Sequence, residues 1–519
     1  MKHSLIAFFL LNSLAWSINS ANAESSTIKL SPMSQIKLGS FDQGAAEIAA
    51  FDAISKRAFV VNGQTKSVDI LSLADPTKPT LLTSISVKKF GSPNSVAVNN
   101  GLVAVAVASK PKQADGSVVL FDTQGQYLHT FSTGALPDMV TFTPDGKRLL
   151  VANEGEPNDD YSVDPEGSIT IITLAERTQS FDMATVRTAG FTHFNKQKLD
   201  PRIRVFGKNA SVAQDLEPEY ITVSADSQTA WISLQENNAL AVLDINQATI
   251  TALLPLGTQS HSTLGNGIDA SDEDGGINIQ NWPVLGMYQP DTIASYEVDG
   301  HTYIVTANEG DARDYDGYSE ETRVAKMTLS KILLDDDPKL AHKRRLGRLK
   351  VSTVNADTDG DNRVDTLYAF GTRSFSIWTA DGEQVYDSGS EFADVSARLY
   401  PKLFNNGDDR SDNKGSEPEA LTIGRVNNVS YAFIGLERSG GVMVYDISKP
   451  REARFVDYLN TRNADLPDEH PDAGDIAPES IVFVSAEDSP TGKPFLITAN
   501  EVSGTVALYA IESVDRVAP

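Results

Sequence analysis

One pattern recurs along the chain and constrains its fold more than any other feature. An apolar run rich in β-branched residues ends in a polar pair that contains Glu, as in "LLVANEG" (149–155), "YIVTANEG" (303–310) and "FLITANEVSG" (495–504), with weaker copies at 230–238 and 432–440. A short strand with a turn such as "PDG" or "VDG" precedes most of these runs, and a second β-rich run follows. Repeats of roughly 40 residues that hold several strands each are typical of a β-propeller.

We therefore predict an all-β chain with a single β-propeller domain over residues 24–519. Counting strand starts gives seven blades, and eight is the alternative, because residues 365–390 either complete the fifth unit or form one of their own. The early strand at 34–41 is expected to pair with the last blade, which removes exposed sheet edges. Long Asp/Gly-rich loop insertions are expected at about 175–216, 246–289, 310–364 and 387–416.

The N-terminus has the layout of an export signal. Lys2 precedes a short apolar core at 5–16, and "ANA" (21–23) is a small-x-small cleavage motif. We expect residues 1–23 to be a signal peptide that is cleaved after Ala23, and the mature protein to be periplasmic or extracellular. No later segment is apolar over the roughly 20 residues that a membrane helix needs, so we expect no membrane span.

Composition narrows the chemistry. The chain has no Cys, which excludes disulfides, thiolate metal sites and thiol catalysis. Its net charge of −26 disfavours nucleic acid as a partner and suits divalent cations, with solubility as the alternative explanation. No His pair has zinc-binding spacing, and there is no P-loop or G-x-S-x-G nucleophile motif. We expect no zinc, haem or nucleotide cofactor.

Acidic residues recur at equivalent positions of the repeats. The first strands of a propeller's blades line its central channel, so the residues at their starts should form a ring. These residues are Glu47, Asn94, Asp138, Glu219, Asp291, Glu419 and Glu479. A second row follows the next strands and contains Glu154, Glu236, Glu309, Glu437 and Glu501. Converging carboxylates repel unless a cation intervenes, and Ca²⁺ accepts six to eight oxygens, so we predict calcium there. The alternative is that each acid caps backbone N–H groups of the following loop.

The insertions carry further carboxylate runs. The spacing of Asp357, Asp359, Asp361 and Asp365 is that of the first half of a calcium loop, although Tyr368 stands where the loop's twelfth-position Glu belongs. Two further runs are candidate calcium ligands on the same reasoning, and solvated turns are the alternative for all three. These two runs contain Asp269, Asp272 and Asp274, and Asp311 and Asp314.

Three arginines lie in or beside the blade-end loops. Arg313, Arg373 and Arg438 are candidates to bind a phosphoester, since a guanidinium holds phosphate as a fork. The alternative is that they form ion pairs with neighbouring acids.

Several long motifs resemble the choice-of-anchor I family. They include "GIDASDEDGGINIQNWPVLGMYQPDTIASY", "TANEGDARDYDGYSEETRV", "DTDGDNRVDTLYAFGTRSFSIW" and "FIGLERSGGVMVYD". The resemblance implies a YVTN/WD40-like propeller of exported bacterial proteins. Its animal relatives resemble mesenchyme-specific cell-surface glycoproteins linked to calcium mineral, and some bacterial members are called alkaline phosphatases. "EPEALTI" with "GLER" is also similar to esterase-like phytase propellers.

Two functions follow as hypotheses. The first is an exported calcium-binding propeller whose acidic channel face binds a ligand or a cell-surface partner. The alternative is a calcium-dependent phosphoester hydrolase, in which cations polarise the phosphoryl group and activate water. The catalytic candidates would then be Glu219, Glu419, Glu437, Arg373 and Arg438.

Overall fold

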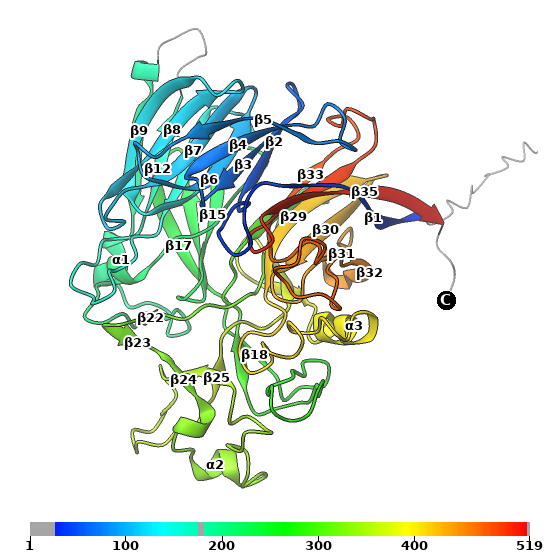
Figure 1. Ribbon diagram of the computed structural model, residues 1–519. Coiled ribbons are helices and arrows are strands. Elements are labelled where there is room, and N and C mark those ends of the chain that lie inside the picture. Colours follow the sequence, from blue (N-terminus) through cyan, green and yellow to red (C-terminus); the bar gives the residue numbers. More distant parts are fainter. Residues whose placement is uncertain (1–25, 175–180, 516–519) are drawn as a thin grey trace, which may run out of the picture.

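A computed structural model describes residues 26–174 and 181–515 (Figure 1). The predicted signal peptide lies outside the described residues. Strands dominate, and the predicted all-β propeller is confirmed. Seven of the sheets in the described part are four-stranded and antiparallel.

The first three of these sheets are consecutive in sequence. Their strands are β2 (Ala49–Asp52), β3 (Arg57–Asn62), β4 (Ser67–Ser72) and β5 (Thr80–Ser86); β6 (Ser92–Asn99), β7 (Leu102–Ala108), β8 (Asp115–Asp122) and β9 (Tyr127–Ala135); and β10 (Pro137–Phe142), β11 (Arg148–Asn153), β12 (Ser168–Thr173) and β13 (Thr185–Gly190).

The fourth and fifth sheets are each followed or interrupted by long loops. They contain β14 (Ile221–Val223), β15 (Thr229–Leu234), β16 (Ala239–Asp244) and β17 (Thr249–Pro255); and β20 (Ile293–Val298), β21 (His301–Ala307), β27 (Phe375–Thr379) and β28 (Gln384–Asp387). Strands β27 and β28 from the segment 365–390 therefore complete the fifth sheet, and they do not form a sheet of their own.

The last two sheets close the ring. They contain β29 (Pro418–Val426), β30 (Val429–Leu436), β31 (Val442–Asp446) and β32 (Arg454–Leu459); and β33 (Pro478–Val484), β34 (Phe495–Asn500), β35 (Thr505–Asp515) and β1 (Ser26–Lys37). The first strand of each sheet contacts that of the next, in the order β2, β6, β10, β14, β20, β29, β33 and back to β2. The N-terminal strand pairs with the last sheet as predicted, but the predicted bounds 34–41 are wrong, because β1 pairs with β35 from Ser26 to Lys37.

Two predicted insertion boundaries are wrong. Strand β13 falls inside the segment 175–216, and β17 falls inside 246–289, and both are fourth strands of their sheets. Both are the outermost strands of their sheets, and most of their residues are exposed or half-buried, so they lack the long apolar runs of the inner strands. The burial of β13 alternates weakly, with Ala189 buried and Thr185 exposed.

Parts of the insertions at 246–289 and 310–364 form a projection below the ring (Figure 1). Its five-stranded sheet contains β18 (Thr258–Ser260), β19 (Leu285–Met287), β24 (Glu321–Arg323), β25 (Lys350–Ser352) and β26 (Tyr368–Ala369). A separate hairpin pairs β22 (Asp314–Tyr315) with β23 (Tyr318–Ser319). Leu340, Leu346 and Leu349 belong to an apolar core of the projection's own.

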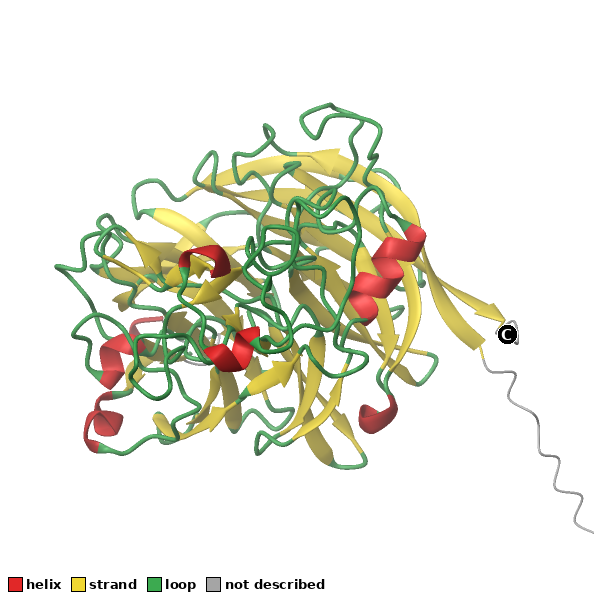
Figure 2. Cartoon of the chain, turned by 90° about the horizontal axis from the view of Figure 1, so that it is seen from below, coloured by secondary structure: helices red, strands yellow, loops and turns green. Residues whose placement is uncertain are grey.

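Helices are few and short (Figure 2). α3 packs Phe392 against Phe375 of the fifth sheet, with ring centroids 6.0 Å apart. The helices are α1 (Val212–Asp215), α2 (Lys331–Leu334) and α3 (Glu391–Leu399), with 3-10 turns at Phe181–Met183, Thr192–Lys196, Val324–Lys326 and Pro450–Glu452.

A repeated β-bulge marks the start of several first strands. The pairing register shifts after Pro93, Pro137, Pro418 and Pro478, at the step that holds Asn94, Asp138, Glu419 and Glu479. The residue before Pro has a positive φ at Leu136, Gln289, Glu417 and Ala477, which is uncommon for residues other than Gly. Bulges bend a strand and redirect a side chain. The Pro–acid motif thus turns each acidic side chain toward the channel.

Candidate functional site in the central cavity

The seven first-strand positions meet in one cavity of about 530 Å³. All seven line it, each supplied by a different sheet of the ring. They are Glu47, Asn94, Asp138, Glu219, Asp291, Glu419 and Glu479. Within the described residues, ten carboxylates and two cationic side chains line this cavity, so its charge is strongly negative.

Only part of the second predicted row of acidic residues, those that follow the second strands of the repeats, lines the cavity. Glu309, Glu437 and Glu501 line the cavity together with the first row. Glu154 and Glu236 are not among its lining residues, although the Glu154 carboxyl is close enough to Asp138 for the two charges to interact. The two rows therefore converge mainly around the fifth, sixth and seventh sheets.

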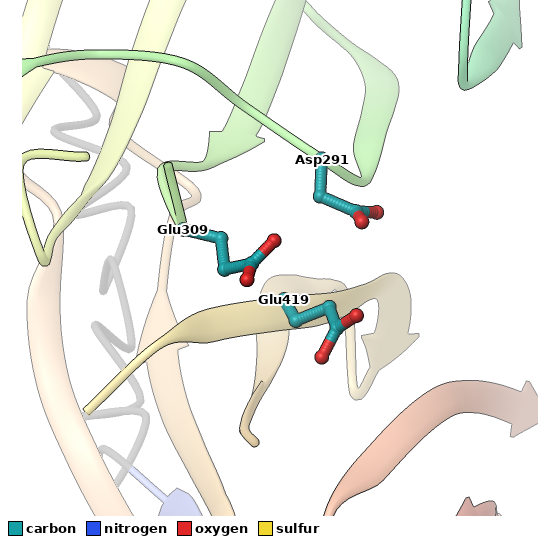
Figure 3. Close-up of side chains that lie close together, drawn as sticks. All are labelled: Asp291, Glu309 and Glu419. Carbon is teal, nitrogen blue, oxygen red and sulfur yellow. The ribbon is translucent and has the colours of Figure 1, made fainter. Parts of the chain in front are cut away.

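Three carboxylates that line the cavity lie close to one another (Figure 3). One oxygen from each of Asp291, Glu309 and Glu419 lies within 4.8 Å of the other two. Asp291 precedes β20 and Glu309 follows β21 in the fifth sheet, while Glu419 is in β29 of the sixth. The group thus bridges two neighbouring sheets, and the contacts of β29 with β20 and β21 hold it together. Below, these residues are called the carboxylate triad.

Two carboxylate oxygens at the cavity lack partners. Glu419 is 9% exposed, and its Oε2 has no hydrogen-bond partner among the described residues. The same holds for the buried Oε2 atom of Glu219. Buried polar atoms are nearly always hydrogen-bonded, so each of these oxygens needs a partner such as a water, a proton or an ion. The capping alternative does not account for these two atoms.

Burial and mutual repulsion raise the pKa of the ring carboxyls. Burial raises the pKa of Glu47 to about 8, and the charges of Glu501 and Asp138 add to the shift. For Glu437, burial and then the charge of Glu309 raise the pKa to about 8. Burial also raises the pKa of Glu419 well above its usual range, followed by the charges of Glu479, Glu437, Glu309 and Asp291. A bound cation would stabilise the ionised carboxylates and so lower these pKa values.

Two cationic side chains of the described residues line the cavity, and only one of them was predicted as a site residue. Arg438 was predicted, and its Nη2 lies 2.8 Å from Glu437 Oε1. Lys414 was missed, and its Nζ lies 2.5 Å from Glu309 Oε1. The only sequence signal for Lys414 was its place three residues before Glu417 in "NKGSEPEA".

Glu417 was also missed, and it belongs to a second acidic group with Glu309 and Glu437. This group carries its own cations. Arg410 Nε donates to Glu417 Oε1 over 2.7 Å, and Lys414 and Arg438 lie 3.6 and 3.5 Å from Glu417 Oε2. Glu417 has a lowered pKa even though burial acts against it, because the charges of Lys414 and Arg410 outweigh the burial. Among the described residues, neither Asp291 nor Glu419 forms an ion pair, and Lys414 only partly offsets the raised pKa of Asp291, which burial and the charge of Glu309 cause.

The other two predicted arginines lie elsewhere, outside the set of described residues that line the cavity. Arg373 donates to three backbone carbonyls, those of Asp269, Ser411 and Asn413, over 2.6, 3.0 and 2.7 Å. Arg313 is buried, is paired with Asp215 and Glu217, and stacks on Phe206. Both are engaged inside the protein, so the structure does not bring the three arginines together as a phosphate clamp.

The run from Asp269 to Asp274 is largely satisfied within the insertion. Asp272 forms a two-bond pair with Arg348 at 2.8 Å for each bond. Asp269 is 1% exposed and accepts from the backbone N–H of Asn278 at 2.5 Å. Asp274 Oδ2 accepts from the side chain of Asn278, whereas its buried Oδ1 has no hydrogen-bond partner among the described residues.

The run from Asp357 to Asp365 is exposed. One oxygen each of Asp357, Asp359 and Asp361 lies within 4.8 Å of the others. Asp365 accepts from Thr358 instead, and Asp357 accepts from the N–H groups of Gly360 and Asn362. A calcium ion at this loop stays a prediction. Of the remaining pair, Asp311 is at the cavity lining and Asp314 is exposed in β22.

The family of this chain follows from its sequence. The pattern of the choice-of-anchor I domain matches residues 47–450, so the chain belongs to that family. Gigasin-3a of Magallana gigas is 32% identical over 200 residues, which are 35% of this chain and 70% of gigasin-3a. The mesenchyme-specific cell surface glycoprotein of Strongylocentrotus purpuratus is 28% identical over 278 residues, which are 46% of this chain and 35% of the glycoprotein.

Solved structures share only a general likeness. Hydrazine synthase of Kuenenia stuttgartiensis has a TM-score of 0.46 at 14% identity, with 91% of this chain and 97% of that one covered. Streptogramin B lyase has a TM-score of 0.45 at 10% identity, with 95% of this chain and 100% of the lyase chain covered. The β-propeller domain of Cps50 (Swd1) from Myceliophteria thermophila has a TM-score of 0.44 at 8% identity, with 93% of this chain and 99% of that domain covered. The fold is established here by strand pairing and not by these scores.

Among the described residues, no helix has both the length and the apolar character that crossing a membrane requires.

Proposed function

We propose that this protein is an extracellular or periplasmic β-propeller that binds a calcium ion in its central cavity. The observation that carries the proposal is the carboxylate triad with its unpartnered, buried Glu419 Oε2. Carboxylates so placed repel one another, and a cation relieves that repulsion.

The donor set favours calcium over softer metals. The side chains that line the cavity offer carboxylate, amide and hydroxyl oxygens, with no His among the described lining residues. Zinc prefers imidazole and thiolate, whereas calcium takes oxygen ligands in irregular geometry. Donors from several sheets suit an ion that tolerates such irregularity.

The location is proposed from the relatives and the N-terminus. One relative is named a cell surface glycoprotein, and residues 1–23 have the features of an export signal. We propose that the acidic face, with calcium bound, contacts a cell-surface partner or an anionic ligand there. Intact-mass measurement of the exported protein should show an N-terminus after Ala23.

Phosphoester hydrolysis remains less supported than binding. Of the three arginines proposed to hold phosphate, Arg438 alone lines the cavity, and it is already paired with Glu437. We therefore propose a binding function and make hydrolysis an outcome of the test below.

Calorimetric titration of the metal-stripped protein with CaCl₂ tests the proposal. We expect saturable binding that weakens at least tenfold in Glu419→Gln and is unchanged in Glu452→Gln, a control at an exposed Glu before β32. Binding that is absent in the unmodified protein, or equal in Glu419→Gln, would refute a cavity site. A chromogenic phosphate ester added to the calcium-loaded protein would reveal hydrolysis.

A further inference from the structure

Lys414 occupies an unusual place beside the carboxylate triad. Its Nζ lies 2.5 Å from Oε1 of Glu309, the one triad member that also belongs to the second acidic group. The Lys414 side chain is 14% exposed, so its charge is poorly screened by water. A cation bound by the triad would share Glu309 with an ammonium group.

The two positive charges oppose each other. A divalent ion and an ammonium on neighbouring oxygens of one buried carboxylate repel strongly, because the effective dielectric is low. Both oxygens of Glu309 are already engaged, since Oε1 contacts Lys414 Nζ and Oε2 accepts from Gln235 Nε2 at 3.1 Å.

A second position for the ammonium is already present. Asp311 Oδ1 and Glu417 Oε2 lie 3.7 and 3.6 Å from Lys414 Nζ, and the Asp311 side chain is 53% exposed. A small rotation of the flexible lysine stem would move Nζ from Glu309 toward this pair. The move keeps the lysine charge compensated and frees Glu309 Oε1.

The backbone that carries Lys414 is held firmly on its other side. Arg373 donates to the carbonyls of Ser411 and Asn413, and the backbone N–H of Lys350 donates to that of Asp412. Gly415 has a φ of +76°, and a Cβ there would lie 2.7 Å from the Arg373 side chain. These contacts fix the loop, so that movement is confined to the lysine side chain.

From this geometry we infer that Lys414 is a built-in counter-ion that competes with calcium for Glu309 and sets the affinity of the cavity. The inference rests on the proposed calcium site. Without calcium, the ammonium neutralises Glu309. With calcium, the ammonium moves to Asp311 and Glu417. The lysine thus lowers the affinity, and a ligand that draws it away would raise it.

Calcium affinities of three proteins test the inference. The proteins are the unmodified chain, Lys414→Met and, as a control, Lys402→Met, which removes an exposed lysine paired with Asp465. We expect Lys414→Met to bind calcium at least tenfold tighter and Lys402→Met to match the unmodified chain. Equal or weaker binding by Lys414→Met would overturn the inference. If Lys414→Met does not fold, Lys414→Gln is judged by the same criterion.

The outcomes separate the inference from the proposed function. Calcium binding by the unmodified chain with no gain in Lys414→Met refutes the role of Lys414 and leaves the site intact. Absence of binding in both proteins refutes the site itself. As an independent readout, Lys414→Arg retains the charge and should not show the gain, whereas a gain there would also contradict competition by charge.

Discussion

The central cavity and the projecting insertions are both rich in carboxylates, yet they differ in how far these carboxylates are paired within the protein. In the insertions, Asp272 pairs with Arg348, and Asp357 caps N–H groups of its own loop. In the cavity, Glu419 and Glu219 each have a buried oxygen without a hydrogen-bond partner among the described residues, and in the insertions Asp274 Oδ1 shares this property. The cavity differs because its carboxylates come from all sides of the ring and converge on one space. Density of acidic residues in a sequence therefore says little about a cation site. Repetition of an acid at one structural position says more.

The largest effect is expected from the buried ion pair that links two insertions. Replacing Arg313 with Met leaves the Asp215 carboxylate, which is 0% exposed, without its guanidinium. Breaking such a pair costs about 3–5 kcal/mol of unfolding free energy. The urea midpoint should fall accordingly, whereas that of Arg363→Met, at an exposed site beside Asp361, should not. If Arg313→Met and Arg363→Met had equal urea midpoints, the buried ion pair between the insertions would contribute no stability, and the contrast with the cavity would be lost.

The next effect is calcium-dependent stability. At calcium concentrations 100-fold above the dissociation constant, binding adds about 2.7 kcal/mol to the free energy of unfolding, which raises the melting temperature. Asp291→Asn should lose most of this rise. Asp299→Asn lies at the other end of the β20–β21 hairpin, is exposed, and should retain it. A full rise in Asp291→Asn would place the ion elsewhere.

The stability of the folded state is expected to depend on pH when calcium is absent. Burial raises the pKa of Glu47 from 4.5 to about 8, so in this interval the folded state binds more protons than the unfolded state. Stability must then fall as pH rises from about 5 to 8. Burial acts in the same direction on Glu437, whose pKa is about 8. Thermal melts should show this slope in metal-free protein and a flatter one with calcium, and an unchanged slope would contradict cation relief of the ring.

The smallest effect is expected at the exposed loop. Asp359→Asn should change the free energy of unfolding by about 0.5 kcal/mol or less, with or without calcium, as for most surface substitutions. A larger calcium-dependent loss there would give the loop a tightly bound ion of its own and would remove the contrast with the cavity.

Much of this architecture could be predicted from the sequence. Repeated strand patterns defined the propeller, the pairing of the N-terminal strand with the last sheet and the ring from Glu47 to Glu479. These features depend on local hydrophobic periodicity, which a sequence displays directly. Strands β13 and β17 escaped prediction because outer strands are half-exposed and lack that periodicity.

The sequence did not predict the lysine at the cavity, for a different reason. Lys414 and Glu417 come from a long loop whose path depends on Arg373, and no local pattern reveals that a loop returns to the channel. Arg373 and Arg313 were predicted to face a ligand, but both are used inside the fold. A sequence shows which groups are charged and leaves open which charges find partners.

Anomalous diffraction from crystals grown with Tb³⁺ in place of Ca²⁺ tests the central claim most directly. We predict a peak between Asp291, Glu309 and Glu419, at about 2.3–2.6 Å from their carboxylate oxygens, as for a calcium ion. A peak confined to Asp357, Asp359 and Asp361, or a cavity without one, would contradict a cation site at the centre of the propeller.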